Sequence, residues 1–337
     1  MPSSAANPST YSRRIKWLGI GAAIVAALYS TLWFWGAAKA KEELGKALAD
    51  TARSGRTADC GNLDIRGFPF RIGVFCDRLT YSDPSESLSV TTGALRSAAQ
   101  IYDPMQGIVE LDGPFELSLP GNNRIKADWT LLHASARVSK PLPKRSSLEI
   151  KDIAVSMPSK SSAVIFKSDN LQAHFRTADN DIDLAASALN MLVGPALAQG
   201  RTIPAFNFDA DIHIKDGVAL AVSGDRDLVT LLRGQSGVLR GVGFNFAQGG
   251  GFTLSGPVAL DEKGLVNADL SIRFSEAKKL GETIEKIAPE IAAYVAPSLS
   301  FAASAAKPGE DPKIDVTIRS GKASIGIIPL GQIPALN

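Results

Sequence analysis

The chain has 337 residues, of which 45% are apolar, and 36 Lys and Arg against 34 Asp and Glu leave a net charge of +2. Two cysteines are too few for a small disulfide-stapled scaffold or a zinc ribbon, and the balanced charge disfavours a nucleic-acid binder. The apolar content excludes a mainly disordered chain, and the length allows one large domain or two ordinary ones.

The first predicted element is a transmembrane helix over residues 17–38. This run of 22 residues carries no charge, and at about 1.5 Å per residue it spans roughly 33 Å, enough for a bilayer core of about 30 Å. Trp17 lies at one end and the aromatic Trp33–Trp35 at the other, as in interfacial aromatic belts. We expect an uncleaved anchor. The alternative is a signal peptide, since Ala38-Lys39-Ala40 fits the small-x-small cleavage pattern.

The flanking charges predict the orientation of this helix. Arg13, Arg14 and Lys16 precede it without any acidic residue, whereas the charges just after it nearly cancel. By the positive-inside rule, residues 1–16 are a cytoplasmic tail and residues 39–337 a periplasmic domain. The sequence therefore predicts a single-pass inner-membrane protein.

Cys60 and Cys76 are predicted to form a disulfide, because an even number of cysteines in an oxidising compartment favours pairing. The segment between them has the pattern of a hairpin with its tip at Gly67, Phe68 and Pro69. That tip would pair Ile65 with Arg71 and bring Cys60 opposite Cys76. The alternative is two buried free thiols; a redox-active pair is disfavoured because no C-x-x-C is present.

Much of the remaining chain alternates apolar and polar residues, which predicts antiparallel strands with one buried and one solvated face. Such strands are expected at 109–119, 125–131, 206–214, 242–246, 252–260, 266–274, 314–318 and 325–327, with turns at 121–123, 249–251, 261–264 and 320–321.

Helices are expected in three further places. Residues 39–53 are rich in Ala, Lys and Glu and extend the membrane helix outward, and 227–233 fits a short helix. Residues 276–295 have an apolar stripe at steps of four and three, strained by Pro289. The predicted fold is mainly β with few helices: a transmembrane helix, then a large curved antiparallel sheet, taco-like or two-layered, with one amphipathic helix near 276–295 and no break into two domains.

The predicted sheet is too wide for its helices to cover. Ten to fourteen strands at about 4.8 Å span roughly 50–65 Å, whereas a helix about 10 Å across shields two or three strands. The sheet must curl, form two layers, or present a groove to an apolar ligand; a self-filled β core is the alternative. The aromatic residues of inward parity that would line a groove are Phe115, Trp129, Phe208, Phe244 and Phe252.

Two segments carry a resemblance to a known family: Arg66-Gly67-Phe68-Pro69-Phe70-Arg71 between the cysteines, and the ending from Ile325 to Pro334. With the basic-flanked membrane helix they resemble the bacterial domain-of-unknown-function family 2125 over nearly the whole chain. This resemblance implies no activity and no functional residues. The motif and the ending also resemble AsmA-like envelope proteins, which implies an inner-membrane anchor and a long curled sheet connected with lipid transport.

The motif also has a physical interpretation. Phe68 and Phe70 share a face, and Pro69 belongs at a tip or an edge because it cannot donate to a β-ladder. Arg66 or Arg71 either meets lipid headgroups or flanks the motif in water.

No catalytic motif is present: the chain has no G-x-S-x-G, H-E-x-x-H, phosphate loop or dinucleotide fingerprint. Asp209, Asp211 and His213 share a strand face and could in principle bind a metal, but a solvated strand face predicts the same residues. We therefore expect a non-enzymatic protein without metal, cofactor or nucleic acid. It would be anchored through residues 17–38 and bind or help move a lipid or another apolar envelope component. The alternative is an envelope scaffold that binds a protein partner.

Overall fold

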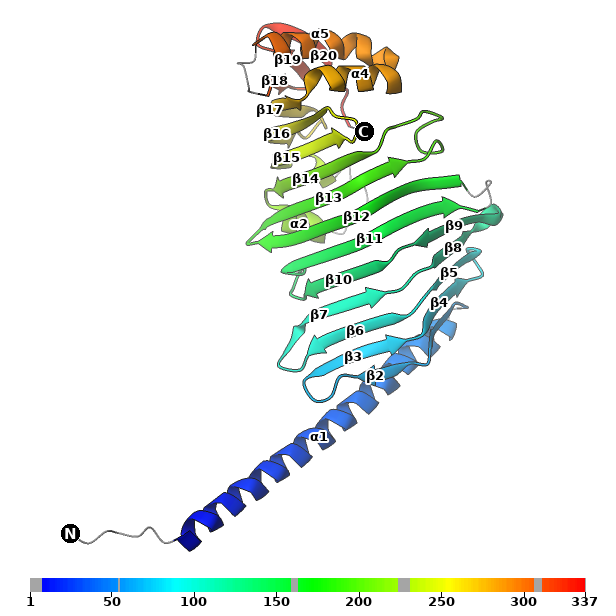
Figure 1. The fold of residues 1–337 in the computed structure, drawn as a ribbon, viewed down its shortest axis with the longest axis vertical. Helices are drawn as coiled ribbons and strands as arrows, with labels where there is room; N and C mark the ends of the chain where they lie inside the picture. Colours follow the sequence, from blue (N-terminus) through cyan, green and yellow to red (C-terminus); the bar gives the residue numbers. More distant parts are fainter. Residues whose placement is uncertain (1–7, 54, 159–162, 224–230, 306–310, 337) are drawn as a thin grey trace, which may run out of the picture.

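A single long helix opens the computed structural model, which describes residues 8–53, 55–158, 163–223, 231–305 and 311–336. This helix, α1 (Pro8–Arg53), projects from one end of a β-rich body (Figure 1). The two predicted helices at 17–38 and 39–53 are therefore one continuous helix. It passes the length and hydropathy test for a membrane span near the N-terminus.

The described residues form twenty strands in one open antiparallel sheet, which confirms the mainly β class (Figure 1). The strands nearest α1 are short: β1 (Thr57–Gly61), β2 (Asp64–Arg66), β3 (Arg71–Cys76), β4 (Arg78–Asp83), β5 (Leu88–Thr92), β6 (Leu95–Gln100), β7 (Asp103–Leu111), β8 (Phe115–Leu119), β9 (Asn123–Asp128) and β10 (Leu131–Arg137). The longer strands of the middle are β11 (Arg145–Met157), β12 (Ala163–Ala178), β13 (Asp181–Val193), β14 (Phe206–Ile214), β15 (Ser236–Phe246), β16 (Gly251–Leu260) and β17 (Val266–Ser275). The last three are β18 (Lys313–Arg319), β19 (Lys322–Ile325) and β20 (Ile328–Gln332).

The strands nearest α1 are short because the sheet bends along a line between β7 and β8 and between β9 and β10. The predicted strands 109–119 and 125–131 are wrong as continuous strands, since each breaks on this line. A Cβ on Gly93 would lie 2.6 Å from the carbonyl oxygen of Gly113, so only glycine allows the close approach. Pro114 has no N–H and so cannot donate a ladder hydrogen bond. At the same bend, Trp129 Nε1 donates a side-chain hydrogen bond to the carbonyl of Leu111 at 2.7 Å.

Beyond the bend, the strands follow one another as a meander from β11 to β19. The predicted strands 206–214, 242–246, 252–260, 266–274 and 314–318 lie within this meander and are confirmed. The strand expected at 325–327 is wrong at its end: β19 stops at Ile325, Gly326 has φ +55°, and Ile327 is fully exposed.

Two helices, not one, cover the C-terminal strands: α4 (Ala277–Ile287) and α5 (Pro289–Ala305). The single helix predicted over 276–295 is wrong, because Ala288 leaves the helical region at φ −150° and ψ 74°. Pro289 opens α5 at a position where a missing N–H costs nothing. A third short helix, α2 (Gly217–Val222), follows β14. The helix expected at 227–233 falls largely on residues 224–230, outside the described part.

The most buried core lies beneath α4 and α5. Its residues come from β17, β18 and the two helices: Ala268, Phe274, Leu280, Leu299, Ala302, Ile314, Val316 and Ile318. Leu280 is almost fully buried. A Cβ on Gly250 would lie 2.4 Å from the backbone nitrogen of this leucine, so the Gly249–Gly251 turn allows α4 to pack closely on the sheet.

The N-terminal hairpin differs from the expected register. The loop between β2 and β3 has four residues, so Ile65 pairs with Val74 and not with Arg71. Cys60 leaves this hairpin and pairs with Leu79 of β4. The Cys60–Cys76 disulfide is nevertheless present, with the two Cα atoms 5.2 Å apart. The bond was predicted correctly, but the cysteines are not paired across one ladder.

Candidate functional site

One side of the central strands carries a continuous row of aliphatic side chains. Each member is the cross-strand partner of the next, from β7 through β10 to β18. The members are Val109, Ala134, Leu148, Ala173, Ala186, Ala210, Val242, Leu254, Ile272 and Ile314. At about 4.8 Å per strand the row is about 43 Å long. It runs across the strands, so no single segment of sequence reveals it.

Two further apolar rows flank the first on the same side, because alternate residues of a strand share a face. One contains Leu132, Ile150, Leu171, Ala188, Phe208, Phe244, Phe252 and Phe274. The other contains Ile72, Ala99, Gly107, Ala136, Ser146, Phe175, Leu184, Ile212 and Leu239. We call the part of this side on β10–β15 the apolar face.

This side of the sheet is covered only in part. Helices α4 and α5 pack on β17 and β18 at the C-terminal end (Figure 1). Helix α2 meets the face at one point, where Gly217 packs against Ile182 and Ile214. Between these contacts the large side chains on β11–β14 are half-buried, whereas those beneath α4 and α5 are buried.

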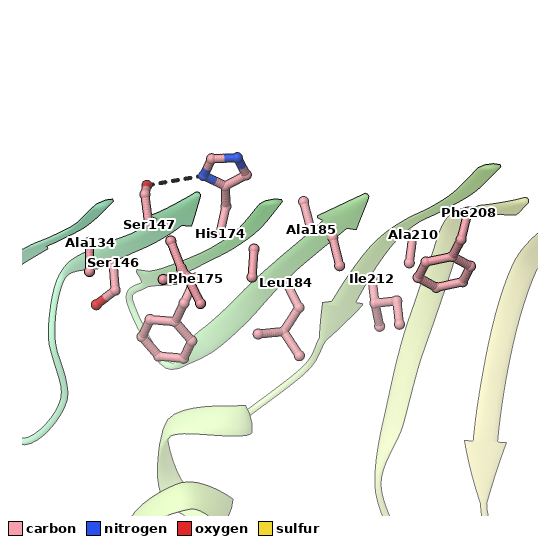
Figure 2. Close-up of a pocket in the computed structure, with 13 residues that line it drawn as sticks. Ala134, Ser146, Ser147, His174, Phe175, Leu184, Ala185, Phe208, Ala210 and Ile212 are labelled. Carbon is pink, nitrogen blue, oxygen red and sulfur yellow. Dashed lines mark hydrogen bonds between the residues drawn. The ribbon is translucent and has the colours of Figure 1, made fainter. Parts of the chain in front are cut away.

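A hollow lies on this uncovered part of the apolar face. Its volume is about 620 Å³, and it spans five strands from Ala134 on β10 to Ile212 on β14. Figure 2 shows Phe175, Leu184, Ile212 and Phe208 projecting to one side of the sheet, whereas His174 and Ser147 project to the other. A second hollow of about 260 Å³ adjoins the first, since Leu184 and Ile212 line both. Small alanines in the central row leave the space between the larger side chains.

The opposite side of the same strands is polar and charged. Asp183 on β13 accepts hydrogen bonds from Arg176 at 2.5 Å and Arg240 at 2.8 Å, and His213 Nδ1 lies 2.9 Å from it. Arg176, then His213 and Arg240, hold the pKa of this carboxyl well below its ordinary value. Arg240 also reaches Asp211 at 3.1 Å. These pairs identify the polar side as the solvated face.

Three of the five aromatic residues predicted to line a groove lie together. The ring centroids of Phe208 and Phe244 are 5.0 Å apart, and those of Phe244 and Phe252 are 5.4 Å apart. The other two lie elsewhere. Phe115 on β8 pairs with Ala127 on β9, which the bend separates from the apolar face, and Trp129 lies on the bend itself.

Phe208 is the one predicted groove residue that lines the central hollow; the other large side chains of the described lining were not predicted. Phe175, Leu184 and Ile212 are neighbours only through strand pairing. Phe206, whose ring centroid lies 5.8 Å from that of Phe244, was also missed, although it has the same parity as Phe208. Alternation at 171–175 and 182–188 was the available signal, and it was weakened by the many alanines there.

The family-like motif lies against α1. The Phe68 ring stacks on Phe34, with centroids 5.2 Å apart, and meets Trp33 edge to face, with centroids 5.5 Å apart. Trp33 Nε1 donates to the carbonyl of Arg71 at 3.1 Å, and the hydroxyl of Tyr29 donates to the carbonyl of Pro69. Trp33 is only 8% exposed as a result.

Gly67 makes this motif loop possible. Its φ is +123°, and a Cβ there would lie 2.7 Å from the carbonyl oxygen of Arg71. The motif therefore joins the sheet to the helix.

The Asp209, Asp211 and His213 row is not brought together as a ligand set. His213 turns to Asp183 and Asp181 on the neighbouring strand. Among the described residues, no group of three His, Cys, Asp or Glu side chains could hold a metal ion. The absence of a cofactor remains a prediction.

Comparison with known proteins gives one family. The family model described as "Uncharacterized protein conserved in bacteria (DUF2125)" matches residues 33–334, which confirms the resemblance based on the motif and the ending. No curated protein matches this chain. The resemblance to AsmA-like proteins remains a prediction.

Proposed function

This chain belongs to the DUF2125 family, whose description names no activity, and we propose that it is a membrane-anchored protein that binds the acyl chains of lipids along its apolar face. The observation that carries the proposal is the uncovered hollow on β10–β14, lined by Leu148, Phe175, Leu184, Phe208 and Ile212. A monomeric soluble protein rarely leaves a contiguous apolar patch of this extent without a ligand or a partner.

Acyl chains fit the chemistry of the hollow. Its lining offers alkyl and aromatic groups. The Ser146 hydroxyl is the polar exception on this side in the described lining, since Ser147 and His174 project to the other side of the sheet (Figure 2). A flexible chain needs no directional contacts, and each buried methylene contributes about 0.8 kcal/mol. The central row runs across the strands for about 43 Å, so a ligand can lie along it or move along it.

The membrane anchor would hold the apolar face close to a source of lipid. We propose that residues 17–38 of α1 span the inner membrane, that residues 1–16 lie in the cytoplasm, and that residues 39–337 lie in the periplasm. Arg13, Arg14 and Lys16 support this orientation. The Cys60–Cys76 disulfide fits an oxidising compartment. Retention of the helix is favoured by the burial of Trp33 and Ala37 against the hairpin, because cleavage after Ala40 would remove both.

We propose binding and not catalysis. Charged and titratable groups lie on the polar side of the central strands, in pairs such as Arg176 with Asp183, and away from the apolar hollow. His174 and Ser147 border the hollow but project to the polar side (Figure 2), so within the described lining a ligand on the apolar face meets the Ser146 hydroxyl without a histidine or carboxylate beside it.

A matched pair of variants on β13 tests the proposal. Ala186→Trp fills the hollow from the apolar face, whereas Ala185→Trp adds the same ring on the polar face. The full chain is extracted in a mild detergent, and lipid retained per protein is measured by native mass spectrometry. We expect the unmodified chain and Ala185→Trp to retain lipid and Ala186→Trp to lose most of it. Equal retention by both variants, or no lipid on the unmodified chain, would refute the proposal.

The scaffold alternative is favoured by one separate observation at the C-terminal edge of the sheet. Strand β20 pairs with β19 in the described residues, and it and the residue before it expose Ile327, Ile328 and Leu330. An extended segment of a partner protein could add to such an edge. A stoichiometric protein in place of lipid in the same spectrum would favour this function.

A further inference from the structure

Apolar side chains cluster on two neighbouring loops beside α1. The β2–β3 loop exposes Phe68 and Phe70, and the β6–β7 turn exposes Ile101 and Tyr102, with Met105 following on β7. The backbone joins the loops, because Ile101 N donates to the carbonyl of Phe70 at 3.1 Å. Phe70 is 67% and Tyr102 75% exposed. We call these five residues the apolar ridge.

The ridge is fixed to α1 within its uncharged run. Phe68 stacks on Trp33 and Phe34, and the Tyr29 hydroxyl donates to the carbonyl of Pro69. Tyr29 lies ten residues before Lys39, the first charge after the run. Ten residues of helix rise about 15 Å, and Trp33 lies about 9 Å before the same charge. The motif is therefore attached well inside the length that a bilayer would enclose.

This attachment decides what covers the ridge. If residues 17–38 cross a bilayer whose core is about 30 Å thick, Tyr29 and Trp33 lie within the leaflet nearest the sheet. A loop stacked on them must then enter that leaflet, and its exposed aromatic residues meet lipid and not water. Aromatic side chains and a methionine suit such an interface, whereas in water they would form an exposed apolar patch.

The polar groups around the ridge also suit an interface. The carbonyls of Pro69 and Arg71 accept hydrogen bonds from Tyr29 and Trp33, so two backbone groups of the loop carry no unmet hydrogen-bond demand in lipid. Arg71 is exposed at the edge of the loop, and Arg66 lies on the preceding strand. The Arg66 guanidinium is bonded to Asp64 at 2.8 Å and lies over the Phe75 ring, so Arg71 is the residue whose guanidinium can reach a lipid phosphate.

We infer that the apolar ridge inserts into the bilayer beside α1 and holds the sheet at a fixed height and tilt on the membrane surface. The occupant is the lipid leaflet on the side of the sheet. Phe68 and Phe70 enter the acyl boundary, and Tyr102 and Met105 lie beside them. This inference concerns the bilayer contact, and it does not depend on whether the apolar face binds lipid.

Nitroxide labels on the full chain in lipid nanodiscs test the inference. Single cysteines are introduced as Phe70→Cys and Tyr102→Cys, with Ile327→Cys, at the far end of the sheet, as the matched exposed control. Because Cys60 and Cys76 are bonded, only the new thiol takes the label. Power saturation then compares access by oxygen, which partitions into lipid, with access by a water-soluble nickel chelate.

We expect the labels at Phe70 and Tyr102 to be open to oxygen and shielded from nickel, and the label at Ile327 to be open to nickel. Nickel access at Phe70 and Tyr102 equal to that at Ile327 would overturn the inference. Shielding of both from oxygen and nickel alike would show a protein contact and would also overturn it. Circular dichroism confirms the fold of each labelled chain, and the high exposure of both positions makes unfolding unexpected.

Discussion

Trp33 of α1 and Phe68 of the β2–β3 loop meet edge to face, with ring centroids 5.5 Å apart and planes at 77°. The two residues are separated in the chain by the rest of α1 and by strands β1 and β2, yet they join the apolar helix to the sheet. Edge-to-face pairs of this kind contribute about 0.5–1.5 kcal/mol beyond the area they bury. This pair links the most apolar segment of the chain with its most distinctive motif.

Phe68→Ala should loosen this joint. The variant removes the ring that stacks on Trp33 and Phe34, and we expect the β2–β3 amides to exchange hydrogen faster by roughly tenfold, for a loss of about 1.4 kcal/mol. Phe70→Ala is the control, because the Phe70 ring is mostly exposed. Equal exchange rates in both variants would contradict the joint.

The Cys60–Cys76 bridge should stabilise the hairpin. It closes a loop of 16 residues in sequence separation, and in the chain-entropy model its loss costs about 2–4 kcal/mol. Cys76→Ser, followed by denaturant unfolding of the full chain, measures this loss. Alkylation of the denatured, unreduced chain should label neither thiol, and labelling of both would show that the bridge is absent.

The helix should remain attached to the mature chain, with the sheet in the periplasm. A reporter active only in the periplasm, fused after Asn337, should be active. N-terminal sequencing should find residues before Trp17, because Trp33 and Ala37 are buried against the hairpin. A mature chain that starts at Lys41 would identify a signal peptide, and a fusion active only in the cytoplasm would reverse the orientation.

Asp183 should make the free energy of unfolding depend on pH. Its pKa is lowered by Arg176, His213 and Arg240, so its contribution is complete above the unfolded pKa near 4 and is lost as the pH falls below it. We expect Asp183→Asn to cost about 1–2 kcal/mol at pH 7 and much less near pH 2, since the pairs are partly solvated. Asp211→Asn, more exposed and bonded to Arg240, should cost less. An equal loss at both pH values would contradict this role.

Alternation along the chain predicted β14, β16, β17 and β18, because each of these strands keeps one parity from end to end. The strands β11, β12 and β13 at the centre of the meander were not predicted. The strand prediction failed where the backbone interrupts the alternation of side chains. Gly113-Pro114 and Trp129 interrupt two predicted strands, and no periodicity marks a bend that depends on the contact of Gly93 with Gly113. The predicted register of the β2–β3 hairpin was also wrong. The same flanking residues fit a three-residue tip and a four-residue tip, so the sequence does not decide between the two registers.

The candidate site was predicted only in its general character. The width of the sheet against the size of its helices indicated that the helices could not cover one apolar side, but it left open whether the sheet would curl, form two layers, fill its own core or present a groove. The lining could not follow from the sequence, because residues as distant as Leu148 and Ile212 meet through successive strand pairs. Phe208, Phe244 and Phe252 were found because they share a parity; Phe115 was misplaced because the bend separates its strand from theirs.

Cross-linking with a photoactivatable phospholipid, carrying a diazirine on its acyl chain, tests directly whether the apolar face binds lipid. The full chain is illuminated in membranes that contain this lipid, and the modified residues are mapped by peptide mass spectrometry. We predict adducts on β11–β14 at Leu148, Phe175, Leu184 and Ile212, in addition to those on α1. Adducts confined to α1 and the apolar ridge, with none on β11–β14, would contradict lipid binding by the apolar face.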